Sequence, residues 1–142
     1  MSQATAGPGF LLQVSASAPP TTYTTIAEVR DITGPEIQVD TDDVTNQSSP
    51  NNFEEIIPTL KRGQTASFDV NLIPADATQN SSTGLLSYLL NRTLMYWNIV
   101  MGSTGKNMTF AGYVTKYGPK FPVTKAMTAS IEIKVTGPIA IA

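Results

Sequence analysis

In the clearest segments of this chain, apolar and polar residues alternate with a period of two, which is typical of β-strands with one buried face. In residues 64–72 the polar face carries only short side chains, namely Thr65, Ser67, Asp69 and Asn71. In residues 126–136 the polar face consists of Thr128, Ser130, Glu132 and Lys134. Both segments are therefore predicted to be strands that turn their apolar faces toward a core.

Other strands are predicted from shorter or less regular patterns. Residues 94–101 are apolar on both faces, as expected of a strand that is covered on both sides. Residues 108–115 alternate around Gly112, which marks a bulge or a close backbone approach. Further short strands are predicted at residues 11–15, 23–29 and 37–40.

One segment departs from the β pattern. Residues 81–91 are predicted to form a short helix, with Ser81 or Ser82 capping its first turn. Its apolar face would pack on the sheet and would consist of Leu85, Leu86, Leu89 and Leu90. The predicted fold is thus one mainly β domain over residues 1–142, an antiparallel β-sandwich or barrel with one flanking helix.

A long connection between strands is predicted at residues 42–63. Loops of more than about 15 residues are usually functional or disordered, and this one is too apolar to be a plain solvated linker. We therefore expect it to contact another subunit. The residues expected to make that contact are Phe53, Glu54, Glu55, Ile56, Ile57, Leu60, Lys61 and Arg62.

Both ends of the chain are predicted to be extended arms, at residues 1–9 and 136–142. A Gly-Pro pair would end the last strand before the second arm, and the apolar Ile139 and Ile141 that follow need cover from water. This second arm is therefore expected to dock on a neighbouring subunit.

The composition excludes several classes of chemistry. The 142 residues include no histidine and no cysteine, which removes the usual catalytic triads, disulfides and thiolate or imidazole metal sites. Nine basic residues against eleven acidic ones give a net charge of −2, without the basic excess of a phosphate-gripping protein. The 19 threonines and 11 serines suit either an interaction surface or simply a β-rich protein.

No motif in the chain predicts catalysis, a cofactor or a metal ion. Gly105-Lys106 lacks the rest of a phosphate-binding loop, and Ser103 with Lys106 lacks the context of a nucleophile pair. Residues 40–51 lack the glycine and the final glutamate of a calcium loop. No stretch is long and apolar enough to span a membrane, so no membrane association is expected.

The order of the segments is similar to that of a known family. The likeness covers residues 8–138 and is carried by residues 25–41, 53–61, 63–76, 110–114 and 129–138. In this order they resemble the major tail tube proteins of long-tailed, non-contractile bacteriophages, the lambda-like siphovirus type. Within residues 53–61, Phe-Glu-Glu-Ile-Ile-Pro-Thr-Leu-Lys resembles the family's Glu-Phe-Ile-Pro-Gly-Leu segment, with Thr59 in place of the usual glycine.

The resemblance implies a structural protein without catalysis or cofactor. It would form hexameric rings that stack into a tube around a tape measure protein, in a virion tail assembled in the bacterial host cytoplasm. Tail terminator and tail tip proteins would be further partners, and the phage DNA would pass through without specific binding. The alternatives are a monomeric β-sandwich decoration or receptor-binding module of a virion, or the inner tube protein of a contractile injection machine.

The lumen of such a tube would be lined by a polar strand face. The best candidate is Thr65, Ser67, Asp69 and Asn71, because this row has no lysine or arginine that would hold a phosphate. The competing candidate is the row from Thr128 to Lys134, which includes a cation.

Overall fold

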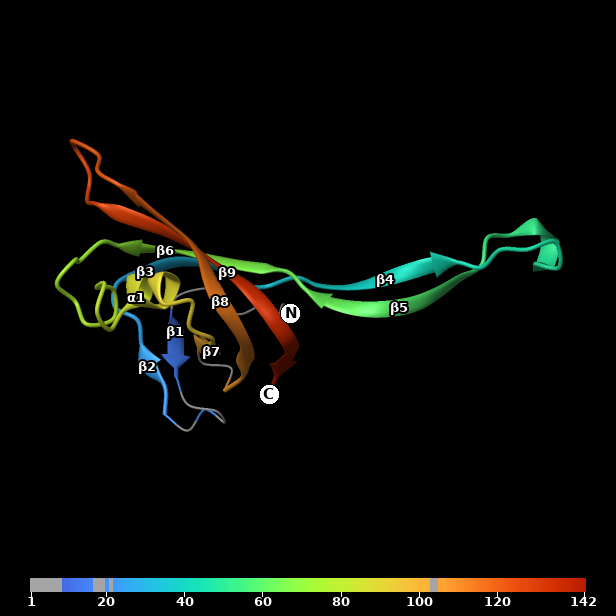
Figure 1. Ribbon diagram of the computed structural model, residues 1–142, viewed down its shortest axis with the longest axis horizontal. Helices are drawn as coiled ribbons and strands as arrows, with labels where there is room; N and C mark the ends of the chain where they lie inside the picture. Colours follow the sequence, from blue (N-terminus) through green and yellow to red (C-terminus); the bar gives the residue numbers. More distant parts are fainter. Residues whose placement is uncertain (1–8, 17–19, 21, 103–104) are drawn as a thin grey trace, which may run out of the picture.

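The chain folds into antiparallel strands with little helix (Figure 1). The computed structural model describes residues 9–16, 20, 22–102 and 105–142. The strands in chain order are β1 (Phe10–Ser15), β2 (Thr24–Thr25), β3 (Val29–Thr33), β4 (Ile37–Asp43), β5 (Ile56–Gly63), β6 (Thr65–Asn71), β7 (Met95–Met101), β8 (Asn107–Lys120) and β9 (Thr128–Ile141). The helical segments are the 3-10 turn η1 (Pro50–Asn52) and the helix α1 (Leu85–Leu90).

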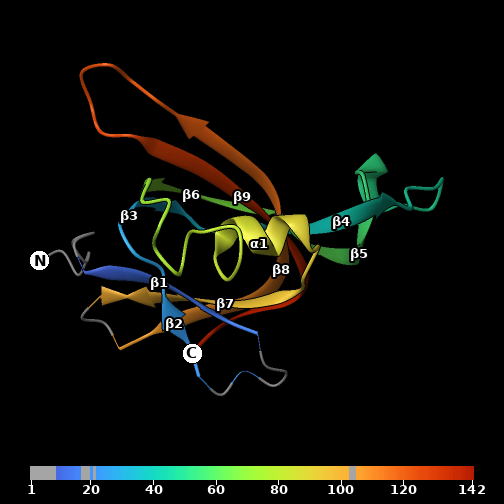
Figure 2. The same ribbon diagram turned by 60° about the vertical axis from the view of Figure 1, so that its left-hand side comes forward.

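Seven of the strands form one sheet in the order β2-β1-β7-β8-β9-β6-β3. The beginning of β8 pairs with β7, whereas the beginning of β9 pairs with β6. The two long strands therefore belong to both halves of the sheet, which folds over a single core. Figure 2 shows α1 on the open side, between the layer of β3 and β6 and the layer of β1 and β7. This architecture confirms the predicted antiparallel β fold with one flanking helix.

The core lies between the two layers and is centred on Trp97. Its ring lies 6.2 Å from that of Phe68 and 6.4 Å from that of Tyr88, between ring centroids. The indole N–H donates to the carbonyl of Gly112 at 3.2 Å. The other fully buried large residues include Leu12, Val70, Leu85, Ile131 and Ile133. The apolar faces predicted for residues 64–72 and 126–136 both contribute to this core, except that Met127 at the edge of the second face is 42% exposed.

The helix is shorter than predicted and presents a different face. It begins at Leu85, after Gly84, and no side chain caps it, so the predicted capping role of Ser81 or Ser82 is wrong. Instead, Oδ1 of Asn80 accepts hydrogen bonds from the backbone N–H groups of the three residues before the helix. The buried side is Leu85, Tyr88 and Leu89, while Leu90 is exposed. The buried residues of the helix are thus three and four positions apart, whereas the predicted apolar face consists of two adjacent leucine pairs. Tyr88 belongs to the buried face because its ring packs edge-on against Trp97.

Two of the predicted extended segments also need correction. Residues 136–142 are not a free arm, because β9 continues to Ile141 and Ala142 exchanges two backbone hydrogen bonds with Asn107. The predicted strand at residues 23–29 is instead β2 and β3, separated by a turn in which Glu28 has a φ of 58°. Of the predicted N-terminal arm at residues 1–9, only Gly9 is among the described residues.

Gly112 makes the close backbone approach that the sequence predicts. A Cβ at this position would lie 2.6 Å from the carbonyl oxygen of Lys134 and 2.8 Å from Cγ2 of Ile133. Register shifts flank it in the β8–β9 pairing, between Thr109 and Ala111 and between Val114 and Lys116. The bare backbone of Gly112 thus lets β8 and β9 approach closely where the strands pass from one layer to the other.

We predict that Gly112→Ala lowers the free energy of unfolding by about 1–3 kcal/mol, because the added methyl group must displace the β9 backbone. Urea unfolding followed by the fluorescence of the buried Trp97 measures this. The control is Gly118→Ala on the same strand, where the new Cβ would meet nothing closer than 3.7 Å. Equal stability of the two variants would show that the close approach imposes no constraint.

Candidate assembly surfaces

The segment predicted as a long loop is the outer part of a β-hairpin. Strands β4 and β5 pair with each other and form a two-stranded sheet that projects from the body (Figure 1). Residues 56–63 are thus a strand, and only the turn between Asp43 and Ile56 is a connection. The prediction of a loop over residues 42–63 is therefore wrong, whereas the expected contact with another subunit stays a prediction.

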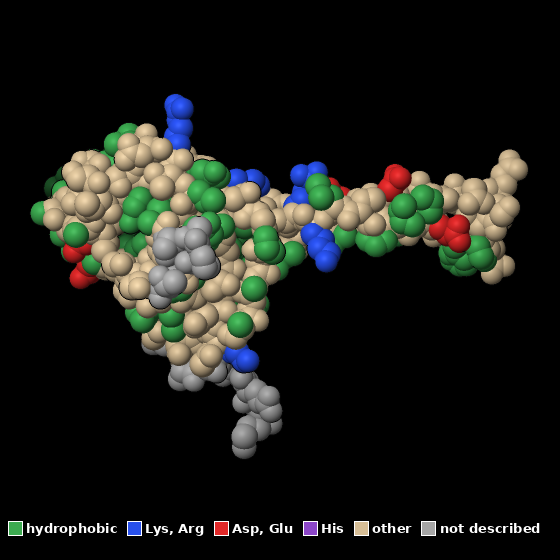
Figure 3. All heavy atoms as spheres, turned by 60° about the horizontal axis from the view of Figure 1, so that its bottom comes forward, with side chains coloured by type: hydrophobic (Ala, Val, Ile, Leu, Met, Phe, Trp, Pro, Cys, Tyr) green, Lys and Arg blue, Asp and Glu red, His purple; other side chains and the backbone are tan. Residues whose placement is uncertain are grey.

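The hairpin exposes a large amount of apolar side chain. Figure 3 shows green apolar patches along the whole projecting ribbon. Phe53 in the turn is 71% exposed and Leu60 is 55% exposed. The exposed large apolar residues of the hairpin are Ile37, Val39, Val44, Phe53, Ile56, Ile57 and Leu60. Patches of this kind mark interaction sites, because a soluble monomer rarely leaves so much contiguous apolar surface in water.

The turn at the end of the hairpin is held by its own hydrogen bonds. The buried Ser49 hydroxyl donates to Glu55 Oε2 at 2.8 Å and accepts the N–H of Asn46 at 3.0 Å. The Thr45 hydroxyl accepts the N–H of Glu55 at 2.8 Å. Hydrogen bonding from the Thr45 side chain and from its backbone N–H also lowers the pKa of the Asp43 carboxyl. The exposed apolar groups are therefore displayed on a turn that is ordered without a partner.

The base of the hairpin is fixed to the body at Gly63. A Cβ there would lie 2.8 Å from Cγ1 of Val135 and 3.2 Å from Cδ1 of Ile139, both on β9. Of the two isoleucines predicted to contact a neighbour, Ile139 is half-buried in this contact, and Ile141 is exposed. The charged residues Lys61 and Arg62 lie just beyond it, and Arg62 Nε pairs with Asp40 at 2.6 Å.

The two polar rows treated as competing candidates are neighbours on one face. Strands β6 and β9 pair in a register that places Ser67 opposite Glu132 and Asp69 opposite Ser130. The Ser130 hydroxyl donates to Asp69 Oδ1 at 2.8 Å. The two rows therefore do not compete, because they form a single polar surface.

This polar face carries cations as well as acids. Lys134 of β9 lies opposite Thr65 of β6. Nζ of Lys116 on β8 forms an ion pair with Oε1 of Glu132 at 3.8 Å. Lys120 lies opposite Thr128 at the far end of the same face. The expectation that the candidate face has no lysine or arginine holds for the β6 row but not for the surface to which it belongs.

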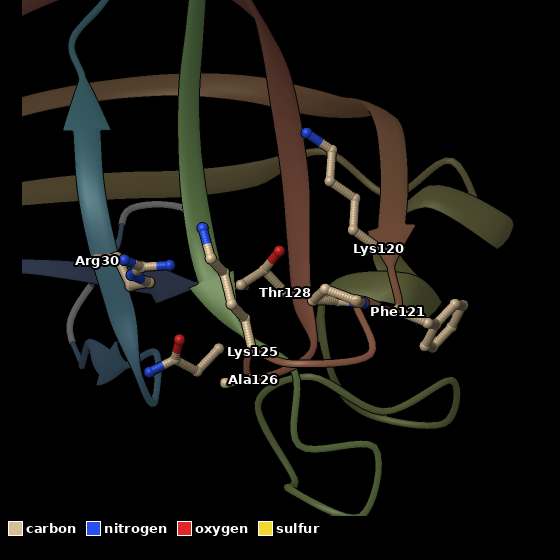
Figure 4. A pocket seen from close by; sticks show the side chains of 8 residues that line it. Arg30, Lys120, Phe121, Lys125, Ala126 and Thr128 are labelled. Carbon is tan, nitrogen blue, oxygen red and sulfur yellow. The ribbon is translucent and has the colours of Figure 1, made fainter.

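A pocket of about 900 Å³ lies at the end of this face, where β3 meets the turn between β8 and β9 (Figure 4). We call it the basic pocket, because its lining includes Arg30, Lys120 and Lys125 as well as Phe121 and Thr128. Its three cations come from two segments about 90 residues apart in the sequence. No local sequence pattern predicts this pocket, because it depends on the order of the strands in the sheet, in which β3 pairs with β6 and β6 pairs with β9.

The part of the chain that the structure describes holds no cluster of three or more acidic or other metal-ligating side chains. Asp40, Asp42 and Asp43 lie along β4, with Asp40 bound to Arg62 and Asp43 to Thr45. Among those same residues, no helix is long and apolar enough to cross a membrane.

One protein family matches nearly the whole chain. The family model for the lambda phage tail tube protein matches residues 12–142. The chain belongs to this family. It is therefore a structural component of the tail tube of a phage virion. Among individual curated proteins, none matches the sequence significantly.

Solved structures of tails and of a baseplate share the fold of this tail tube protein. The tail of an empty gene transfer agent particle, refined with C6 symmetry, matches with a TM-score of 0.76 and 13% identity over 98% of this chain and 99% of that chain. The baseplate of the anti-feeding prophage matches with a TM-score of 0.74 and 10% identity over 100% and 97%. The SPP1 tail tube matches with a TM-score of 0.66 and 14% identity over 94% and 74%.

For this tail tube protein we predict that Ser49→Ala loosens the hairpin turn and leaves the body unchanged. The substitution removes both hydrogen bonds of the Ser49 hydroxyl, so the Asn46 amide should exchange its hydrogen at least about tenfold faster. Hydrogen exchange read by NMR measures this. The control is Ser48→Ala, because the Ser48 side chain makes no hydrogen bond to a described residue. Unchanged exchange at Asn46 would show that the turn is ordered by other contacts.

Proposed function

We propose that this chain polymerises as hexameric rings that stack into a tail tube, with the β4–β5 hairpin bridging adjacent subunits. The observation that carries the proposal is the hairpin itself, whose ordered turn displays apolar side chains that nothing in the described part of the subunit covers. The sixfold symmetry of the gene transfer agent tail, which shares this fold, supports the ring size.

The proposed contact residues are those of the hairpin and of the chain end. They are Phe53, Glu54, Glu55, Ile56, Ile57, Leu60, Lys61 and Arg62, together with Ile141. Ile139 contributes to the base of the hairpin, where it packs near Gly63. Burying this apolar surface between copies would supply the main driving force for assembly.

The polar face of β3, β6, β9 and the end of β8 is proposed to line the lumen. Its opposite side is the apolar core, so this half of the sheet has only one face free to meet solvent. Asp69 and Glu132 are interspersed with Lys116 and Lys134, and the Lys116–Glu132 pair offsets part of the positive charge. A mixed surface of this kind would let DNA pass without the counterion release that causes tight binding.

The other proposed partners are a tape measure protein in the lumen during assembly and tail terminator and tail tip proteins at the two ends. The protein would act without catalysis, in a tail assembled in the bacterial host cytoplasm. Contractile injection systems share this fold as well. The sheath–tube complex of an extracellular contractile injection system, in its extended state, matches with a TM-score of 0.69 and 12% identity. The lambda-type family match favours the non-contractile type.

We predict that shortening the hairpin abolishes polymerisation and leaves a folded monomer. Replacing residues 42–57 by Asn-Gly joins Thr41 to Pro58, which already face each other, through a two-residue turn. The core lies outside the deleted part, so Trp97 fluorescence and urea unfolding should match those of the intact chain. Sedimentation and negative-stain microscopy measure assembly. Normal tubes from the shortened chain would refute the bridging role.

We predict that Asp69→Lys permits tube assembly but slows genome delivery. The substitution would place a ring of positive charge in the lumen without touching the apolar side of β6. The control is Asp69→Asn, which keeps an acceptor for the Ser130 hydroxyl without adding a cation. Particles in which every subunit carries each variant are compared for DNA ejection rate. Equal rates would contradict a lumenal position for Asp69.

A further inference from the structure

The outer part of the hairpin has a distinct chemical character. Residues 41–60 contain no lysine or arginine, and their acidic residues are Asp42, Asp43, Glu54 and Glu55. Among the described residues, no side chain pairs with Glu54. Phe53 stands beside it and is mostly exposed. The hairpin therefore ends in a surface that is both acidic and apolar.

The basic pocket has the complementary character. Within the described chain, Arg30, Lys120 and Lys125 have no acidic side chain within ion-pairing distance. The nearby Glu28 carboxylate instead accepts a hydrogen bond from Asn71, which also lines the pocket. Phe121 lines the pocket and is 67% exposed. Figure 4 shows Arg30 and Lys125 on the same side of the strands as Thr128. Three cations and an exposed aromatic ring thus face solvent together.

These two surfaces lie at opposite ends of the subunit. The hairpin leaves the body next to Thr65 at the start of β6, and Asn71 at the end of β6 lines the basic pocket. Figure 1 shows the hairpin and the turn between β8 and β9 at opposite ends of the longest axis. If identical copies stack in the same orientation along this axis, the hairpin end of one copy faces the pocket end of the next.

The hairpin is long enough to cross such a junction. Seven residues of β4 at about 3.3 Å each extend about 23 Å from the body before the turn begins. The pocket volume of about 900 Å³ is in the range that accommodates several side chains of a short turn. Because the turn is already ordered, docking would cost little conformational entropy.

We propose that the hairpin turn of one copy docks in the basic pocket of the adjacent copy, with Glu54 and Glu55 near Arg30, Lys120 and Lys125 and with Phe53 against Phe121. This inference rests on the proposed bridging role of the hairpin, and it names the surface that receives it. The contact joins two different surfaces of the same chain, so it propagates along a stack instead of closing a pair.

Cross-linking in assembled tubes tests the contact directly. The chain has no cysteine, so Glu54→Cys combined with Ala126→Cys at the pocket introduces the only two thiols. Tubes grown from this variant or taken from phage tails should give a ladder of covalent multimers with a short bismaleimide. Within one copy the two thiols lie at opposite ends and cannot react with each other.

Two further variants control the cross-linking. Thr65→Cys with Lys134→Cys joins facing residues of β6 and β9, so it should react within one chain and show that the reagent works. In the variant with Glu54→Cys and Arg92→Cys, the second thiol lies on the turn after α1 instead of at the pocket. This variant should give no ladder of covalent multimers. A ladder only from the Glu54–Ala126 pair supports the inference. No ladder from that pair in intact tubes overturns it.

Charge reversal gives an independent measurement. Lys125→Glu or Glu54→Lys alone should raise the critical concentration for polymerisation about tenfold or more, and the two together should restore most of the loss. Arg92→Glu makes the same charge change away from both surfaces and should have little effect. Trp97 fluorescence confirms that each variant is folded.

The outcomes separate this inference from the proposed function. Should the chain with the shortened hairpin still form tubes, the bridging role and the docking in the pocket would both be wrong. Should the shortened chain fail to assemble while neither charge reversal changes the critical concentration, the hairpin would bridge subunits through another surface. Only the docking in the basic pocket would then be overturned.

Discussion

The body of the protein depends on the pairing of β8 with β9, because each of these strands belongs to both layers around the core. Their first halves pair outward with β7 and β6, respectively. The strands can approach each other this closely only because Gly112 has no side chain between them. The core around Trp97, the position of α1 and the polar face all follow from this one junction.

The two surfaces proposed to serve assembly lie outside that core. The hairpin is joined to the body at its base, where Gly63 packs against Val135, and the basic pocket lies at the opposite end of β6. Substitutions at either surface can therefore change association without removing contacts that stabilise the subunit. The fold itself is compatible with very different sequences, since solved structures that share it are only 10–14% identical to this chain.

The sequence predicts those parts of the fold where burial imposes a pattern. β6 and β9 alternate because one face of each is in the core, and Gly112 stands out because a strand interior disfavours glycine. The sequence predicts a loop in place of the hairpin because both faces of β4 and β5 are exposed, so no burial enforces alternation. A register shift between Val39 and Thr41, opposite Thr59 and Leu60, interrupts it further. The sequence does not predict the basic pocket, because Arg30 lies near Lys120 and Lys125 only as a result of the order of strands in the sheet.

Placing an acidic, apolar projection at one end of the subunit and a basic recess at the other gives any head-to-tail stack a direction. One terminus of such a polymer would present unoccupied hairpins, and the other would present empty pockets. The proteins that cap the two termini could then not be interchangeable, since one would need a cationic, aromatic-lined hollow and the other an anionic protrusion. The sign of the charge exposed at each terminus would thus distinguish the two ends of the tail from each other.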